Sequence, residues 1–346
     1  MRERGCTGEQ VSKRQALPPI IRALRVYLIE YPRRHLQADA NRLVVPLVLA
    51  FLALSLVLRY RVGISPYYAA DASGGRIAVL GLGFCVLPLA APLLLLALLG
   101  GFRNRRPDAR FWLICVLSVT TPFVNQYGAI LLGVLAPAPG VAPAIEPEQS
   151  WRTSEFLRHN GYDLRAIACY LAAPVLYWLA TPSIRNGPFF GLTRRGFVGP
   201  AYALILLLAV PLLVAASFRP DFLTSYPRFE PGIVSVPPGA HFWHAVATFE
   251  LLYAIQFIAL EVFFRGFMVM SLEPYIGSGS VPVMMCVYTF IHFVKPMPEA
   301  LASIVGGYFL GVIAFYSRSV LGGIVVHIGI ALTLELLSFL RHAGVF

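Results

Sequence analysis

Charged residues are scarce in this sequence. Only 13% of the 346 residues are charged, whereas a soluble globular domain carries roughly a quarter. Hydrophobic residues make up 58% of the chain, so too few polar side chains remain to cover a soluble protein of this length. The composition therefore excludes an ordinary soluble fold.

Three other absences narrow the class of protein further. None of the five cysteines shows the CxxC spacing, so neither a disulfide framework nor a thiolate metal site is indicated. The apolar runs do not alternate with polar residues, which excludes an outer-membrane β-barrel. The first 41 residues are polar and basic, so no cleavable signal peptide is predicted.

Long apolar runs dominate the sequence after the first 41 residues. Several approach or exceed the roughly 20 residues that a helix needs to cross a bilayer. We therefore predict an all-α polytopic membrane protein with about nine transmembrane helices. These are expected near residues 42–58, 77–100, 111–136, 164–181, 197–217, 243–270, 281–295, 299–316 and 320–340.

The formal net charge of +11 fits a membrane protein better than a nucleic-acid-binding one. Basic residues of membrane proteins collect in cytoplasmic loops, where they meet anionic headgroups. Residues 102–110 and 183–195 are basic, whereas residues 137–163 are more acidic. This distribution predicts an integral membrane protein with a cytoplasmic N-terminus and the lipid bilayer, not nucleic acid, as its partner. The expected location is the cell (inner) membrane.

The chain divides into four predicted segments. Residues 1–41 form a basic cytoplasmic segment, part of which has the spacing of a helix on the membrane surface or belongs to a solvated tail. Residues 42–217 hold transmembrane helices of unassigned role, and residues 218–240 form an external loop. Residues 241–346 hold most of the membrane-embedded ionisable side chains. Within the second segment, residues 137–163 are expected to be an extended external connection.

Glu261 and Arg265 lie four residues apart in an apolar stretch, and therefore on one helix face. A charge near the bilayer centre costs at least a few kcal/mol and needs a partner. Arg265 would keep Glu261 ionised against desolvation. The pair fits either a catalytic site or a structural ion pair that fixes helix packing.

Two histidines on otherwise apolar helices, His292 and His327, join this pair. Imidazole and carboxylate together provide acid–base chemistry, oxyanion stabilisation or metal ligation. With Glu261 they could form a three-ligand zinc site, although the sequence has no HExxH, so no cofactor is favoured and zinc stays an alternative. Tyr288, Glu299 and Glu335 are secondary or substrate-binding candidates for the same cavity. Glu299 could instead cap the helix expected at 299–316, and Glu335 could lie near the outer interface.

The segments "LEVFFRG", "YTFIH" and "GGIVVHIGIA", within residues 243–340, resemble the CPBP family. This family comprises type II CAAX prenyl proteases and related bacteriocin-processing and immunity proteins. Its first motif is E-E-x-x-x-R, which Glu261 and Arg265 match while Leu260 occupies the first glutamate position. Tyr288 and His292 correspond to its second motif, F-x-x-x-H.

The third family motif is H-x-x-x-N, where His327 matches and Ala331 replaces the asparagine. The resemblance implies an intramembrane endopeptidase acting on a peptide or membrane-protein substrate. Glu261 would activate the water, His292 and His327 would orient it and stabilise the oxyanion, and Arg265 would hold Glu261. The degenerate motifs leave a non-catalytic peptide-binding or partner-binding protein of the same fold as an alternative, and a small-solute or proton-coupled transporter as another.

Overall fold

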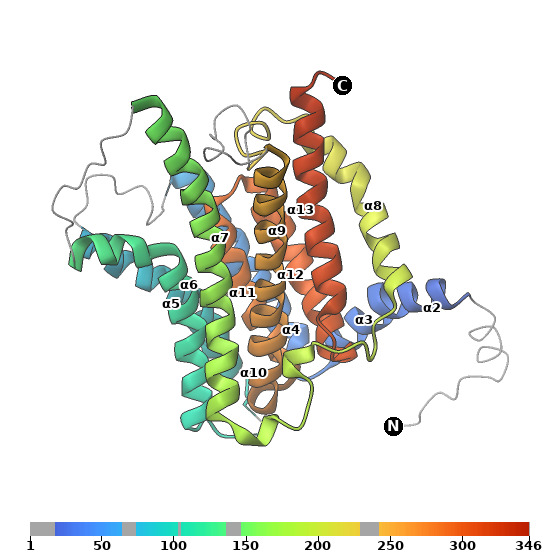
Figure 1. The fold of residues 1–346 in the computed structure, drawn as a ribbon. Coiled ribbons are helices and arrows are strands. Elements are labelled where there is room, and N and C mark those ends of the chain that lie inside the picture. The colour runs from blue at the N-terminus through green and yellow to red at the C-terminus, as the bar shows by residue number, and fades with distance from the viewer. Residues whose placement is uncertain (1–17, 64–73, 103–104, 136–146, 229–241, 346) are drawn as a thin grey trace.

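The computed structural model describes residues 18–63, 74–102, 105–135, 147–228 and 242–345. Within these ranges the chain forms helices joined by turns, and no strand is present. The long helices stand side by side as an upright bundle (Figure 1). The predicted all-α architecture is therefore confirmed for the part of the chain that the structure describes.

Each predicted span corresponds to a long helix or helical stretch. These are α4 (Asn41–Val57), α5 (Gly74–Leu98), α6 (Ala109–Leu135), α7 (Pro147–Ala180), α8 (Gly199–Ser217), α9 (Phe242–Glu261) continued by η5 (Val262–Met268) and α10 (Val269–Ile276), α11 (Ser280–Ile291), α12 (Met297–Ser317) and α13 (Leu321–His342). Seven stretches of the described residues are long and apolar enough to cross a membrane. One of them, His244–Val294, includes the turn η6 (Gly277–Gly279) and so holds two predicted spans, while α6 is not among the seven.

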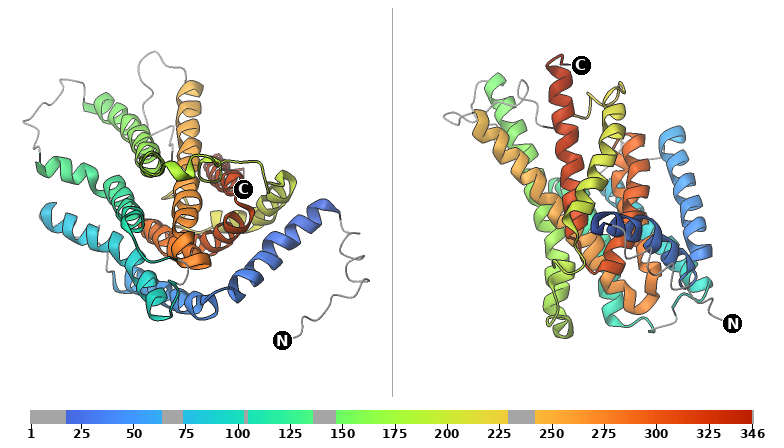
Figure 2. Two further views of the ribbon diagram at one scale, coloured as in Figure 1. Left: turned by 90° about the horizontal axis from the view of Figure 1, so that it is seen from below. Right: turned by 90° about the vertical axis from the view of Figure 1, so that its right-hand side faces the viewer.

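Of the two alternatives left open for the N-terminal segment, a helix is what the described residues form. α2 (Pro19–Arg25), η1 (Val26–Glu30) and α3 (Tyr31–Gln37) form one helical arm that runs across the upright helices, as both views in Figure 2 show. Tyr27 stacks on Tyr202 of α8 with ring centroids 5.1 Å apart. The arm is therefore packed against the bundle and is not a solvated tail; residues 1–17 lie outside the described ranges.

One local expectation is wrong. Residues 147–163 were expected to be an extended connection, but they form the first turns of α7, which begins at Pro147. Proline is tolerated in the first turn of a helix, since the N–H that it lacks has no intrahelical partner there. The remainder of that predicted connection, residues 136–146, lies outside the described ranges. So do residues 229–240 of the expected external loop.

α11 forms the centre of the bundle. All of its residues except Ile291 are buried, and it packs against α4, α5, α12 and η5. A helix that is apolar on every side is stable only when other helices surround it. α11 and the seven fully buried residues of η5 are therefore the rigid support of the polar side chains described next.

Candidate active site

Glu261 and Arg265 form a buried ion pair where α9 passes into η5. The Arg265 Nη1 atom lies 3.0 Å from the Glu261 Oε1 atom, and the two side chains are 0% and 1% exposed. The wider turn of η5, a π-helix, lies directly after Glu261, and such turns are frequent at functional sites. The pairing that the sequence spacing predicted is present.

His327 reaches the same carboxylate from α13. Its Nδ1–H donates to Glu261 Oε1 at 3.0 Å, and its ring lies 4.3 Å from the ring of Phe257. Gly323, one turn earlier on α13, makes this approach possible, because a Cβ atom there would collide with the Glu261 carboxylate. Gly323 and His327 therefore both contribute to the contact between α13 and the Glu261 carboxylate.

Tyr288 of α11 connects the remaining groups. Its hydroxyl lies 3.5 Å from His327 Nε2, and the Arg265 guanidinium lies 4.0 Å from its ring centroid. His292, at the end of α11, donates from Nδ1 to the Tyr288 carbonyl at 2.8 Å, and the two rings are 4.5 Å apart. The structure therefore brings Glu261, Arg265, His292 and His327 together around one tyrosine.

These contacts fix the orientation of both imidazoles. A carbonyl or carboxylate oxygen accepts, so Nδ1 carries the hydrogen in His292 and in His327. In a neutral imidazole the other nitrogen, Nε2, is then the one with a lone pair. Both rings line a cavity of about 440 Å³, which we call the active-site cavity. The two imidazoles thus lie at the wall of the same cavity.

Leu260 and Ala331 also line the active-site cavity, whereas Glu261 and Arg265 are not among its lining residues. Two of the positions at which the sequence departs from the family motifs therefore lie at the cavity wall. The carboxylate of Glu261 is behind the wall, fully buried against Arg265 and His327.

Of the secondary candidates, Tyr288 and Glu299 line the active-site cavity and Glu335 is not among its lining residues. Glu299 accepts from the Tyr226 hydroxyl at 3.2 Å and lies 3.7 Å from Lys295 Nζ. Burial lowers the pKa of Lys295, and the charge of Glu299 opposes that effect. Glu335 accepts from the backbone N–H of Arg228 at 3.0 Å, so it fixes the chain segment at the cavity mouth.

Sequence reasoning missed several polar residues of the cavity mouth. Arg228 lines the cavity, and its guanidinium lies 5.2 Å from the ring centroid of Tyr253. Gln256 lines the cavity too, and Asp163 lies nearby on α7, 0% exposed. A polar residue inside a predicted apolar span was the available signal for Gln256. Asp163 was assigned to the connection 137–163 and Arg228 to the loop 218–240, so neither carried such a signal.

The sequence favoured no cofactor and left zinc as an alternative at Glu261, His292 and His327. Within the described ranges, no group of three or more His, Cys, Asp or Glu side chains could hold a metal ion. Glu261 Oε1 is already shared by Arg265 and His327, and the carboxylate is not at the cavity wall. A three-ligand site needs all its donors to converge on one point, so no step below is routed through a metal.

Comparison with known proteins supplies one match. No curated protein and no solved structure matches the chain. A family model described as type II CAAX prenyl endopeptidase Rce1-like matches residues 242–333, a little over a quarter of the chain. The match includes Glu261, Arg265, His292 and His327, and it agrees with the resemblance found in the sequence. Over residues 242–333 the chain is therefore similar to the Rce1-like family of type II CAAX prenyl endopeptidases.

Proposed function

We propose that this protein is an intramembrane endopeptidase that hydrolyses a peptide bond in the active-site cavity. The observation that carries the proposal is that His292, His327 and Tyr288 line one cavity, with the Tyr288 hydroxyl 3.5 Å from His327 Nε2. The match to an endopeptidase family supports the same reaction class. The long apolar helices support a site within the membrane.

The contacts favour His327 as the general base. A water in the cavity would donate one hydrogen to His327 Nε2 and the other to His292 Nε2. Its oxygen attacks the peptide carbonyl carbon while His327 takes the proton, and His327 then returns this proton to the leaving amine nitrogen. The Glu261 carboxylate at Nδ1 stabilises the imidazolium that forms, as the buried carboxylate of a catalytic triad does.

This assignment changes the role that the sequence suggested for Glu261. A base must lie within hydrogen-bond reach of the proton that it removes, and Glu261 is buried behind the wall. We therefore propose that Glu261 is a positioning residue and that Arg265 holds its carboxylate. Tyr288, whose hydroxyl lies beside His327 Nε2, is the nearest side-chain donor for the oxyanion.

The substrate that fits is a peptide segment associated with the membrane. Leu212, Leu213 and Leu260 contribute apolar surface to the active-site cavity, whereas Arg228, Lys295 and Glu299 supply charge. A segment with apolar residues near the cleaved bond and a polar end would match this arrangement. We further propose that the protein resides in the cell (inner) membrane with its N-terminus in the cytoplasm.

A second candidate function rests on the cavity wall itself. Leu260 and Ala331 place apolar side chains where the family motifs have a glutamate and an asparagine. A wall that lacks both groups suits a protein that binds a peptide or partner without cleaving it. Such a protein would retain its ligand in full when His327 is replaced.

Comparison of peptide termini distinguishes the two functions. Membranes containing wild type should yield new N-termini of membrane-associated peptides that His327→Gln membranes lack. His342→Gln, on the same helix but bonded to Ser338 near the chain end, is the matched control and should cleave as wild type does. Identical termini from wild type and His327→Gln would exclude hydrolysis by this site.

A further inference from the structure

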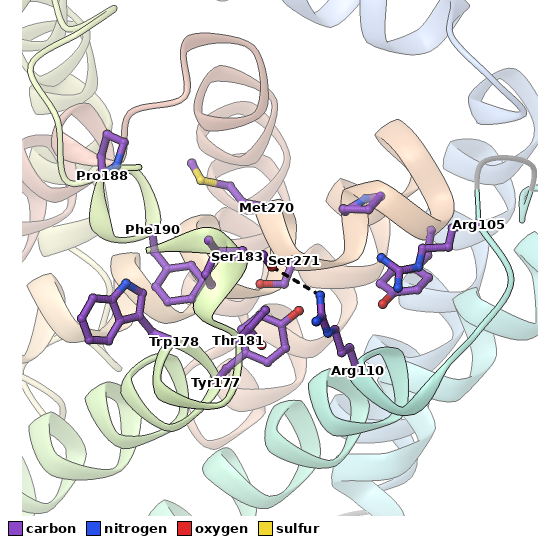
Figure 3. A pocket seen from close by; sticks show the side chains of 13 residues that line it. Arg105, Arg110, Tyr177, Trp178, Thr181, Ser183, Pro188, Phe190, Met270 and Ser271 are labelled. Atoms are coloured by element: carbon purple, nitrogen blue, oxygen red, sulfur yellow. Dashed lines mark hydrogen bonds between the residues drawn. The ribbon is translucent and has the colours of Figure 1, made fainter. Parts of the chain in front are cut away.

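A second cavity lies at the end of the bundle where α6 begins and α7 ends, as Figure 3 shows. Its volume is about 240 Å³, and it shares no lining residue with the active-site cavity. The residues around it come from the start of α6, from α7 with the turns η3 (Pro182–Ile184) and η4 (Phe189–Gly191), and from α10. We call it the basic-end pocket.

Two arginines, Arg105 and Arg110, line the basic-end pocket, and they differ in how their charge is balanced. Arg105 pairs with Asp108. The Asp108 carboxylate also accepts from the Tyr275 hydroxyl at 2.6 Å and from the Phe111 backbone N–H at 3.1 Å. Together these bonds, with that of Tyr275 the largest effect, lower the pKa of Asp108 to about 2. Asp108 is therefore charged, and its charge is matched by Arg105.

Arg110 has no such partner. Within the part of the chain that the structure describes, its guanidinium bonds the neutral Ser183 hydroxyl at 3.3 Å and pairs with no carboxylate. Figure 3 shows its side chain directed across the pocket toward Ser183. A guanidinium presents several donors in a fixed fork that matches the oxygens of a phosphate. The basic-end pocket thus has an unneutralised positive charge and most of its donors unused.

The other residues that line the basic-end pocket suit an oxyanion such as a phosphate ester. Thr181, Ser183 and Ser271 bring hydroxyl groups to the basic-end pocket, and Tyr177 and Trp178 bring aromatic rings. Hydroxyls accept and donate hydrogen bonds and so adapt to a phosphate ester. We propose that the basic-end pocket binds a phosphate group, with Arg110 as its principal contact and Ser183 as the second.

The surroundings indicate that this phosphate belongs to a lipid. Trp112 on α6 and Leu176 and Leu179 on α7 are 61%, 55% and 52% exposed, and they lie within three residues of Arg110 or Trp178. Exposed apolar side chains beside a basic and aromatic pocket are typical of a headgroup site at the edge of a bilayer. The occupant is therefore an anionic phospholipid, its headgroup in the pocket and its chains along these two helices.

Lipid binding to the full-length protein tests the site. Wild type in detergent should bind phosphatidylglycerol more tightly than phosphatidylcholine, measured by the rise in thermal unfolding temperature across a lipid titration. Arg110→Gln should weaken phosphatidylglycerol binding about tenfold or more, since a charge-assisted contact is lost. The affinity of Arg110→Lys for phosphatidylglycerol should lie between those of wild type and Arg110→Gln, because lysine keeps the positive charge but lacks the forked donors of the guanidinium.

Arg34→Gln is the matched control. Arg34 lies at the same end of the bundle, over the ring of Tyr316, and it does not line the basic-end pocket. Equal weakening by Arg34→Gln and Arg110→Gln would overturn the site in favour of a general surface charge effect, and unchanged binding in Arg110→Gln would overturn it directly. Orthophosphate or glycerol phosphate binding as tightly as phosphatidylglycerol would overturn the lipid assignment. Equal unfolding temperatures of the variants in phosphatidylcholine show that they are folded.

Discussion

At the scale of single residues, the candidate site is built from side chains that orient one another. The spacing of Glu261 and Arg265 in the sequence predicted that they pair, and in the structure Arg265 Nη1 lies 3.0 Å from Glu261 Oε1. The sequence did not reveal that Glu261 faces His327 and not the cavity, because the periodicity of one helix does not show which neighbour it meets. The role of each group follows from that contact.

Replacement of Glu261 by glutamine should lower kcat about a hundredfold or more, because the imidazolium of His327 would lose its stabilising charge. Glu261→Asp should restore part of the loss. The informative measurement is the dependence of kcat/KM on pH, whose acidic limb should shift in Glu261→Gln if Glu261 acts through His327. A fall in unfolding temperature with an unchanged pH profile would assign Glu261 a purely structural role.

Ala331→Asn should raise kcat. Position 331 lines the active-site cavity one turn beyond His327, so an amide there adds a donor near the developing oxyanion, and one such donor is worth roughly 3–4 kcal/mol in a preorganised site. The same change at Leu332, which is 38% exposed and outside the cavity wall, is the control. Equal rates in Ala331→Asn and wild type would argue against an oxyanion at this position.

At the scale of the helices, glycines set how closely α13 approaches its neighbours. A methyl group at Gly323 would collide with Glu261, and one at Gly322 with the ring of Tyr202. Gly306 on α12, in contrast, has open space around it. Glycine is therefore required at some positions of these helices and merely tolerated at others.

Gly323→Ala should destabilise the protein by about 1–3 kcal/mol, as overpacking of a core does, and should also reduce activity by displacing Glu261. Gly83→Ala on α5 is the matched control, because Gly83 is exposed, has open space around it and does not line the active-site cavity. It should leave activity unchanged and stabilise α5 by up to about 1 kcal/mol through helix propensity. The prediction is checked by measuring the unfolding temperature and the activity of both variants. Equal changes in the two variants would show that close packing at Gly323 is not needed.

The helical arm formed by α2, η1 and α3 is held by His35, which is 0% exposed. Its Nδ1 lies 3.1 Å from the Tyr308 hydroxyl and its Nε2 3.0 Å from the Ser278 carbonyl. Burial lowers the pKa of His35 from 6.5 to about 4, against the opposing effects of Ser278 and Asp39. Proton binding at this residue is therefore coupled to the docking of the arm.

The free energy of unfolding should fall as the pH is lowered from 6.5 to 4. In that window the unfolded chain protonates His35 and the folded one does not, so the loss approaches about 3 kcal/mol near pH 4. Above pH 6.5 both states are neutral at this residue and its contribution is complete. Unfolding of His35→Gln should depend less on pH across this window than unfolding of wild type or His342→Gln; identical slopes would contradict the coupling.

Helix positions could be predicted because bilayer-spanning helices need long apolar runs, and each predicted span has its helix. The start of α7 could not be predicted, since residues 147–163 are polar and contain no apolar run that would mark a helix. The wall of the active-site cavity could not be predicted either. Asn125, Arg228 and Ala331 lie far apart in sequence and meet at this cavity only in the folded chain.

At the scale of the whole molecule, the basic segments that include Arg110 and Ser183 meet at one end of the bundle. Glu273, which pairs with Arg318 after α12, precedes Pro274 of the basic-end pocket in sequence. Arg219 and Asp221 follow α8, which starts near the first end and runs to the other. The proposed orientation places the first end in the cytoplasm, where positive residues are favoured.

Cysteines introduced at Arg106 and Arg219 should therefore react with a membrane-impermeant maleimide from opposite sides, in a background that lacks Cys6. The position 219 cysteine should be labelled in intact cells, and the position 106 cysteine only after the cells are opened. Labelling of both from outside would contradict nine crossings with a cytoplasmic N-terminus.

The burial of α11 has a consequence for any attempt to isolate the domain that the family model marks. α4 and α5, which cover α11, come from residues far upstream of position 242. In a fragment that starts at residue 242, α11 would be exposed to lipid tails, although protein surrounds it in the full chain. The fragment would also lack Asn125 and Arg228, which line the active-site cavity. Residues 242–333 alone are thus not an independent structural module. Deletion or fusion boundaries placed at their ends would separate helices that pack against one another.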